Sequence, residues 1–263
     1  MIFDTHSHYD DDAFSEDRDE LIRSLPEYGI GKVVDVGASV ESCHLAQELA
    51  HRYEYVYCAL GVHPTEIGGL MEDGAEENRK WLKEQLLTDP KCVALGEIGL
   101  DYYWDDTKPE DQKKWFEWQL ELAREVKKPV IIHSREAAKD TADIMRAHRA
   151  GEIGGVVHCY SYSKEMAREF LDMDFYFGIG GVLTYKNARK LVETVEYLPL
   201  ERIVLETDCP YLSPVPNRGK RNSSLNIPYI VTTMSQIKGI SEEEIINMTW
   251  KNAHRLYRMQ NQQ

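Results

Sequence analysis

The segment KVVDVGASVESCHLAQELAHRYEYVYCALGV, Lys32–Val62, holds the pattern that decides the fold. A β-branched apolar run at Lys32–Val36 is followed by an amphipathic stretch at Val40–Arg52 and a second apolar run at Val56–Val62. The two apolar runs predict buried strands, and the stretch between them predicts a helix. A strand, a helix and a strand in this order indicate a parallel β–α–β unit.

The same alternation continues in both directions from this segment. Six further apolar runs predict strands at Ile2–Phe3, Val93–Leu95, Val130–Ile132, Val156–Val157, Phe175–Ile179 and Ile203–Leu205. Helical patterns separate them at Ser15–Tyr28, Glu76–Thr88, Pro109–Val126, Ala137–His148, Lys164–Met173 and Tyr185–Tyr197, and two more follow at Ile227–Lys238 and Ser241–Arg258. Eight such units in 263 residues predict an α/β fold, a closed (β/α)8 TIM barrel with a C-terminal helical extension. No linker divides the chain, so we expect residues 1–263 to form a single domain.

Composition and charge exclude several classes of protein. A hydrophobic fraction of 42% is typical of a folded domain and excludes a disordered chain. The net charge of −14 excludes binding of nucleic acid along a broad basic surface, because an acidic surface repels phosphates. The sequence shows no membrane-spanning run, no signal peptide and no C-x-x-C pair among its five cysteines. We therefore expect a cytoplasmic protein with reduced thiols that binds no membrane.

Seven possible metal ligands lie at the ends of the predicted strands. They are His6, His8, His63, Glu97, His133, His158 and Asp208. The carboxyl ends of the strands of a barrel meet at one rim, so these side chains should converge there. His6 and His8 are two residues apart on a strand and face the same side, so both can bind one ion. Even six ligands from this set are too many for one tetrahedral ion, and they indicate two divalent ions that share a carboxylate.

Seven strings of the sequence resemble one known family. They are DTHSHYD at Asp4–Asp10, GVHP at Gly61–Pro64, GEIGLDYYWD at Gly96–Asp105, IIHSR at Ile131–Arg135, VHCYS at Val157–Ser161, GIGG at Gly178–Gly181 and ETDCPYLSPVPNRGKRN at Glu206–Asn222. In this order they resemble the TatD-type metal-dependent deoxyribonucleases, which are amidohydrolase-like barrels. The resemblance covers almost the whole chain and is more specific for the family than for the substrate.

The resemblance implies a role for each matching residue. His6, His8 and Asp208 would bind the first metal ion, Glu97 would bridge the two ions, and His133 and His158 would complete the second site. Asp208 would also act as the acid or base for the attacking water. Glu206 would orient a histidine or that water, His63 would line the pocket near the scissile group, and Arg135 would contact a substrate phosphate. The imidazoles favour Zn or Mn, whereas the family is usually described as Mg-dependent, so the two divalent ions are expected to be Mg, Mn or Zn.

The activity implied by the resemblance is hydrolysis of DNA, as a 3′→5′ exonuclease on single strands or strand ends, by a monomer. Two alternatives stay open. The first is an ester or amide hydrolase with the same site, such as an aminoacyl-tRNA deacylase or a lactonase. The second is a metal-dependent binding module without turnover, which the complete ligand set disfavours.

Two further features concern the substrate. Arg218, Lys220 and Arg221 form a basic loop that either holds phosphates of a DNA strand or is a solvated surface turn. A set of aromatic residues follows the fourth and sixth predicted strands, Tyr102, Tyr103, Trp104, Tyr160 and Tyr162. These rings either stack on bases or anchor the loops by packing.

Overall fold

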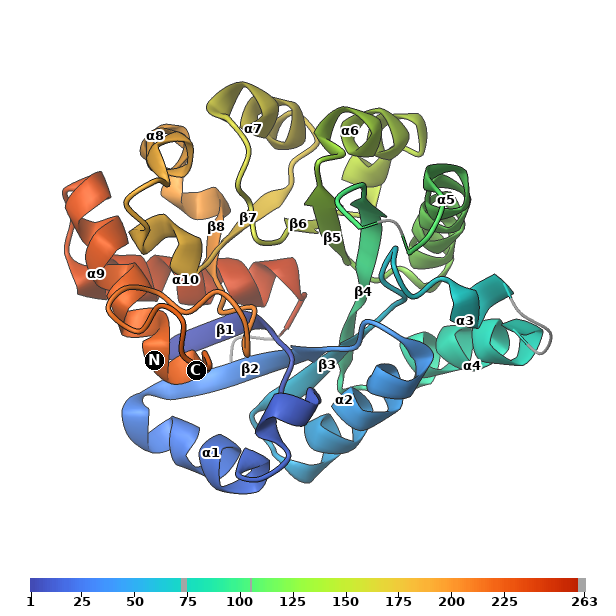
Figure 1. Cartoon of the computed structure of the whole chain (residues 1–263), viewed down its shortest axis with the longest axis horizontal. Coiled ribbons are helices and arrows are strands. Elements are labelled where there is room, and N and C mark those ends of the chain that lie inside the picture. Colours follow the sequence, from blue (N-terminus) through green and yellow to red (C-terminus); the bar gives the residue numbers. More distant parts are fainter. Residues whose placement is uncertain (72–74, 105, 260–263) are drawn as a thin grey trace.

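Eight parallel strands form one sheet in the computed structural model of this chain, which describes residues 1–71, 75–104 and 106–259. The strands lie in sequence order, and each pairs in parallel with the next. They are β1 (Ile2–Ser7), β2 (Ile30–Val36), β3 (Val56–Leu60), β4 (Cys92–Asp101), β5 (Val130–Arg135), β6 (Gly155–Val157), β7 (Tyr176–Ile179) and β8 (Ile203–Leu205). The predicted (β/α)8 barrel is confirmed (Figure 1).

Helices in the described residues alternate with the strands and surround them (Figure 1). They are α1 (Arg18–Ser24), α2 (Val40–Arg52), α3 (Gly68–Met71), α4 (Ala75–Thr88), α5 (Pro109–Val126), α6 (Ala138–Ala147), α7 (Lys164–Leu171), α8 (Arg189–Tyr197), α9 (Ile227–Lys238) and α10 (Glu242–Leu256). α9 is the helix of the eighth unit, so α10 alone extends the barrel. None of these helices has both the length and the hydrophobicity that crossing a membrane requires.

Backbone hydrogen bonds join β1 to the end of β8 and close the barrel. The carbonyl of His6 accepts hydrogen bonds from the N–H groups of Thr207 (3.3 Å) and Asp208 (2.9 Å). The N–H of His8 donates to the carbonyl of Cys209 (2.8 Å). Closure of the barrel therefore brings two predicted histidine ligands beside the predicted aspartate ligand, although they are about 200 residues apart in sequence.

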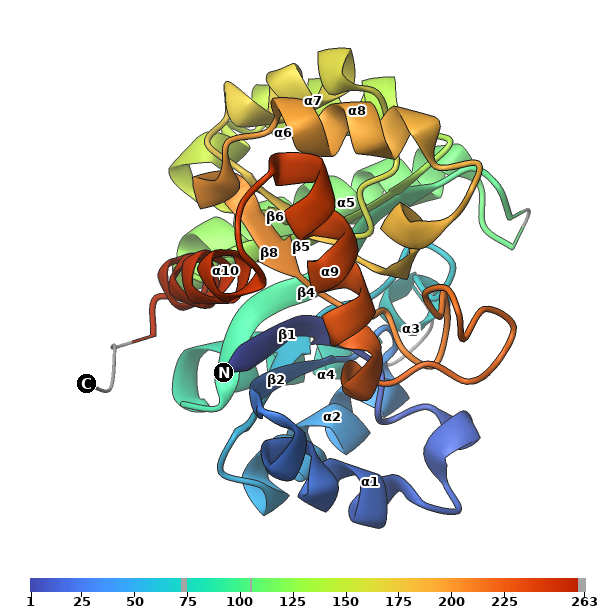
Figure 2. The ribbon, with the colours of Figure 1, turned by 90° about the vertical axis from the view of Figure 1, so that its left-hand side faces the viewer.

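The helix α10 covers the opposite end of the barrel. The Tyr257 hydroxyl, just after α10, donates to the carbonyl of Thr5 (2.7 Å). The ring of Phe3 lies against those of Trp250 and His254, with centroids 5.8 and 5.5 Å apart. Figure 2 shows α10 beside the start of β1, away from the long loop that follows β8. A site is therefore expected at the end at which the strands finish.

Three strands that carry predicted ligands are longer than their apolar runs. β1, β4 and β5 continue into polar sequence, so His6, Glu97 and His133 lie within strands rather than after them. Pairing with the neighbouring strand continues there, because the backbone needs those hydrogen bonds whatever the side chains are. Periodicity of apolar residues cannot show such pairing.

The first predicted helix is also shorter than expected. Ser15–Tyr28 was expected to be one helix, but α1 ends at Ser24 and Leu25–Tyr28 forms a 3-10 turn. Pro26 has no N–H to donate to the preceding turn, which explains the early end. All five cysteines are free thiols, in agreement with their spacing.

Candidate metal centre

A cavity of about 890 Å³ opens at the carboxyl ends of the strands. Six of the seven possible ligands at the strand ends line it, namely His8, His63, Glu97, His133, His158 and Asp208. His6 lies beneath them and is fully buried. The sequence-based expectation that these residues converge at one rim is met by their mutual distances, which define two clusters around Glu97.

The first cluster contains one atom each from His6, His8, Glu97 and Asp208. The Nε2 atoms of His6 and His8 lie 3.1 Å apart. His6 Nε2 lies 3.4 Å from Glu97 Oε2 and 3.6 Å from Asp208 Oδ1. The corresponding distances from His8 Nε2 are 3.7 and 3.4 Å. Four donor atoms thus surround one point.

These spacings fit a metal ion. A tetrahedral ion that binds nitrogen and oxygen at about 2.0–2.1 Å places its ligand atoms about 3.3–3.4 Å from one another. The five distances of the first cluster, 3.1–3.7 Å, bracket that value. Neutral imidazoles with ionised carboxylates are donors that Zn and Mn accept. The donor set of this chain therefore fits a divalent cation at this position.

The second cluster lies around the other oxygen of Glu97. Glu97 Oε1 is 2.7 Å from both His133 Nδ1 and His158 Nε2, and these two nitrogens are 3.2 Å apart. His63 Nε2 is 3.7 Å from the same oxygen, so His63 also lies within reach of this cluster. The closest atoms are at hydrogen-bonding distance, and a cation there requires them to separate by roughly half an ångström.

Two hydrogen bonds orient the histidines toward these clusters. His8 Nδ1–H donates to the carbonyl of Val36 (2.7 Å), which leaves Nε2 with its lone pair facing the first cluster. His133 Nε2–H donates to Asp101 Oδ2 (2.9 Å), which leaves Nδ1 facing the second. A carboxylate behind a ligating histidine fixes its tautomer and raises its basicity. Sequence reasoning did not select Asp101, although it stands in the quoted string GEIGLDYYWD.

Electrostatics keep both carboxylates of the site ionised. Burial raises the pKa of Glu97, but His158 and His133 outweigh burial and hold it well below its ordinary value. Burial likewise opposes ionisation of Asp208, and its hydrogen bond to His8 lowers the pKa nevertheless. The two ionised carboxylates therefore draw positive charge into the pocket.

The same surroundings lower the pKa of some histidines of the site and raise that of others. Burial, reinforced by His158, lowers the pKa of His6 to about 4, and burial with His133 lowers that of His63 to about 3. Burial also opposes protonation of His8, but Asp208 outweighs it and raises the pKa to about 10. Either protonated imidazoles or bound cations can supply the charge that the carboxylates attract.

Glu206 lies behind the predicted ligands, in a space made by a glycine. Its Oε1 accepts a hydrogen bond from the N–H of Cys159 and lies 3.8 Å from His158 Nδ1. Burial raises the pKa of Glu206 to about 8, although His158 acts in the opposite direction. A Cβ atom at Gly178 would lie 1.9 Å from Glu206 Oε2, so only glycine leaves room for this carboxyl group. The predicted role of Glu206 in orienting a histidine stays a prediction, with His158 the nearest ring.

The predicted substrate-binding cations lie in different surroundings. Arg135 lines the cavity, whereas Arg218, Lys220 and Arg221 do not. Arg221 donates to both carboxylate oxygens of Asp17 (2.7 and 2.5 Å), and the Arg218 guanidinium lies 4.4 Å from the centroid of a tyrosine ring. Contact of this loop with substrate stays a prediction, and Arg221 would have to leave Asp17 to make one.

Known proteins with similar sequence share the whole length of this chain. YabD of Bacillus subtilis, an uncharacterized metal-dependent hydrolase, is 39% identical over 98% of this chain and 100% of its own. The uncharacterized metal-dependent hydrolase TatD of Mycobacterium tuberculosis is 34% identical over 97% of both chains.

Solved structures agree with the sequence comparison. The crystal structure of YjjV, a TatD homolog from Escherichia coli, has a TM-score of 0.90 at 31% identity, with 98% of both chains covered. An organophosphorus hydrolase variant from Deinococcus radiodurans shares the fold alone, with a TM-score of 0.64 at 16% identity over 97% of this chain and 92% of that one. The model of the family described as TatD related DNase matches residues 3–258. The chain therefore belongs to the TatD related DNase family and is a metal-dependent hydrolase.

Proposed function

We propose that this hydrolase cleaves phosphodiester bonds of DNA, as a 3′→5′ exonuclease that acts on single strands or strand ends. The observation that carries the proposal is that Glu97 presents one oxygen to each of two donor clusters at the floor of an open cavity. In this proposal His6, His8 and Asp208 hold one divalent ion, His133 and His158 hold a second, and Glu97 contacts both. Two such ions would stabilise charge on the attacking and leaving oxygens of an in-line displacement.

The residues of the chain have separate tasks in this reaction. Asp208 takes a proton from the attacking water, whose oxygen forms a bond to phosphorus while the bond to the 3′-oxygen of the preceding nucleotide breaks. The freed 3′-oxygen takes up a proton, and the terminal nucleotide leaves as a monophosphate. Arg135 at the cavity wall holds a phosphate oxygen of the strand. No nucleophilic side chain is needed.

The acidic surface supports catalysis at a strand end. With a net charge of −14, the protein repels long stretches of phosphate backbone. Attraction is limited to the cavity and its rim, where bound cations, Arg135 and the basic loop Arg218–Arg221 would supply the positive charge. Weak binding of a terminus fits this charge distribution better than tight binding along a duplex.

End-labelled DNA tests the proposal. Single- and double-stranded oligonucleotides are incubated with the protein and Mg, Mn or Zn, beside an aminoacyl ester that reports carbonyl chemistry. We expect stepwise shortening of the single strand from its 3′ end, and none by His6→Ala or Glu97→Ala proteins that keep the wild-type circular dichroism spectrum. Hydrolysis of the ester alone, or full nuclease activity in both variants, contradicts the proposal.

A further inference from the structure

The structure separates the five aromatic residues that follow the fourth and sixth strands into two groups. Tyr102, Tyr160 and Tyr162 are at least half-buried, and their hydroxyl groups bond to Asp140, Ser163 and Ser134 respectively. These three rings anchor loops. Tyr103 and Trp104 instead keep 49% and 51% of their surfaces exposed. Adjacent exposed rings beside a cavity form an apolar patch of the kind that binding surfaces use.

The two exposed rings are held at the cavity by the same carboxylate that orients a metal ligand. Asp101 Oδ1 accepts hydrogen bonds from the backbone N–H of Tyr103 (2.9 Å) and of Trp104 (3.3 Å). Its other oxygen, Oδ2, accepts from His133 Nε2. The rings are therefore tied to the reacting centre through one side chain and are not the end of a free loop.

Arg135 completes this surface. Its guanidinium carbon lies 3.8 Å from the centroid of the Tyr103 ring and 5.7 Å from that of Trp104. The rings of Tyr103 and Trp104 meet edge to face, with centroids 4.8 Å apart. Trp104 and Arg135 both line the cavity that contains Glu97. A flat indole, a second ring and a fixed cation thus stand together beside the donor clusters.

We propose that Trp104 is a stacking platform for a nucleobase next to the scissile phosphate, and that Tyr103 holds Arg135 in position to bind that nucleotide's phosphate. The inference rests on the proposed function and adds the group that the site recognises. Stacking of a base on an exposed indole is tolerant of sequence, because every base has a π-face. The platform therefore selects strands that carry bases, whatever their sequence, over esters that lack a planar ring.

Substrates with and without a base test the platform. One single-stranded oligonucleotide carries normal bases at its 3′ end, and a second carries tetrahydrofuran abasic nucleotides in the last two positions. The measured quantity is the ratio of kcat/KM for the two substrates. Removing a stacking ring costs about 5- to 150-fold, so Trp104→Ala should lower this ratio by that factor and Trp104→Phe should lower it less.

A matched control comes from the far end of the barrel. Tyr28 precedes β2 and is 65% exposed, so Tyr28→Ala also removes an exposed ring. This variant should keep the wild-type ratio. Circular dichroism and thermal unfolding confirm that each variant is folded.

The outcomes separate this inference from the proposed function. If the wild-type protein cleaves DNA and Trp104→Ala keeps the wild-type ratio, the platform is refuted while the nuclease assignment stands. If the wild-type protein cleaves neither oligonucleotide, the nuclease assignment fails, and binding decides on the platform. Fluorescence anisotropy of the two labelled oligonucleotides in EDTA at low salt then measures the preference for bases. A preference that is absent, or equal in wild-type and Trp104→Ala proteins, overturns the inference.

Discussion

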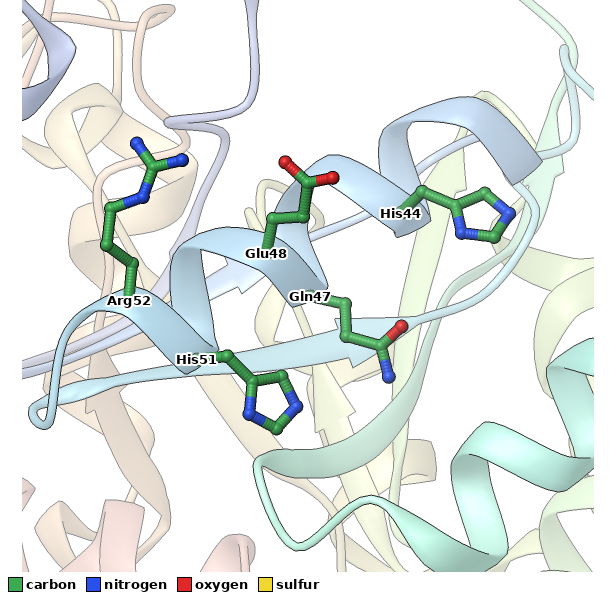
Figure 3. Close-up of a pocket in the computed structure, with 5 residues that line it drawn as sticks. All are labelled: His44, Gln47, Glu48, His51 and Arg52. Carbon is green, nitrogen blue, oxygen red and sulfur yellow. The ribbon is translucent and has the colours of Figure 1, made fainter.

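Two hollows of this molecule contain histidines and charged side chains, yet they are built differently. One is the cavity at the barrel mouth, and the other lies on the outer face of α2. Figure 3 shows the second, in which His44, Gln47, Glu48, His51 and Arg52 all project from one helix. The mouth instead collects its candidate ligands from six different strands or from the loops that follow them. Residue types alone do not distinguish these two regions.

The two regions differ in whether their side-chain contacts converge on one carboxyl group. On α2 the histidine and the arginine pair with different carboxylates, His51 with Asp89 (2.9 Å) and Arg52 with Asp19 (3.0 Å). At the mouth, five imidazoles lie within 3.7 Å of the one carboxyl group of Glu97. Distributed pairs satisfy each other, whereas convergence on one carboxylate leaves several lone pairs facing a common point. The comparison shows that convergence marks the site.

Removing the shared carboxylate is the change with the largest expected effect. Glu97→Gln keeps the shape of the side chain but removes its charge from both clusters, so binding of both cations should fall together. His51→Ala, on the outer face of α2, should leave the metal content unchanged. Metal analysis after equilibrium dialysis measures the two variants beside the wild-type protein, for which we expect two equivalents. Two tightly held equivalents in Glu97→Gln would show that the clusters do not depend on their common carboxylate.

The convergence itself was predictable from the sequence, because the fold fixes where strand ends meet. The apolar runs located the eight strands, and barrel geometry then placed His6, Glu97 and His158 at one rim. The bounds of β1, β4 and β5 were not predictable, since pairing with a neighbouring strand extends them into polar sequence. The short helix α3 was missed as well, because four residues are too few for a helical period to show.

A smaller effect, on stability, is expected when Gly178, which lies against Glu206 behind the predicted ligands, is changed. In Gly178→Ala the new Cβ would lie 1.9 Å from Glu206 Oε2, so this buried carboxyl group would have to shift. Overpacking of this kind costs about 1–3 kcal/mol of unfolding free energy. Gly180→Ala is the matched control, because its nearest contact is an ordinary 3.4 Å. Urea unfolding measures both variants.

A double variant sharpens this prediction. Glu206→Ala removes the group that the new methyl meets, so Gly178→Ala should cost less stability in that background than in the wild-type protein. Additive losses in this cycle would mean that Gly178 is needed for some reason other than space for Glu206.

A partial loss of metal binding is expected when Asp101, which accepts the hydrogen bond from His133, is changed. In Asp101→Asn the new amide can turn an N–H toward His133 Nε2, where the ring also carries a proton, so the ring no longer holds its tautomer. Loss of such a partner typically lowers metal affinity or activity by roughly 10- to 100-fold. Metal titration and initial rates measure the effect. If this variant bound metal with wild-type affinity, the role of Asp101 would be limited to holding the loop at Tyr103 and Trp104.

Asp101 also illustrates what the sequence could not show. Nothing in GEIGLDYYWD distinguishes the aspartate that supports His133 from one that caps a turn, and this residue does both. The loop Arg218–Arg221 shows the reverse case. Its charge pattern indicates a phosphate site, but pairing of Arg221 with Asp17 depends on a contact between segments about 200 residues apart. The carboxylate that orients a histidine and the carboxylate that occupies an arginine are both set by tertiary contacts, which the sequence alone does not show.

The smallest effect is expected on the α2 side of the comparison. Asp89 is buried there and accepts hydrogen bonds from Gln47 (2.5 Å), His51 (2.9 Å) and the N–H of Lys91 (2.8 Å). In Asp89→Asn the shape is kept but the charged acceptor is lost, at a cost of about 1 kcal/mol. The rate of DNA hydrolysis should not change, because none of these groups lies at the barrel mouth. Urea unfolding and the nuclease assay measure the two quantities.

The pH dependence of the stability lost in Asp89→Asn shows whether the charge of Asp89 is its cause. Burial raises the pKa of Asp89, but the hydrogen bonds from Gln47, the Lys91 N–H and His51 outweigh it, so the pKa in the folded protein lies below the ordinary 3.8. A lowered pKa means that the stabilisation is complete above the unfolded-state pKa and is lost as the pH falls through the folded-state value. The gap in unfolding free energy between wild-type and Asp89→Asn proteins should therefore be constant from pH 7 to about 5 and narrow progressively below about pH 4. A gap that does not narrow at all below pH 4 would assign the effect to packing of the amide rather than to the charge of Asp89.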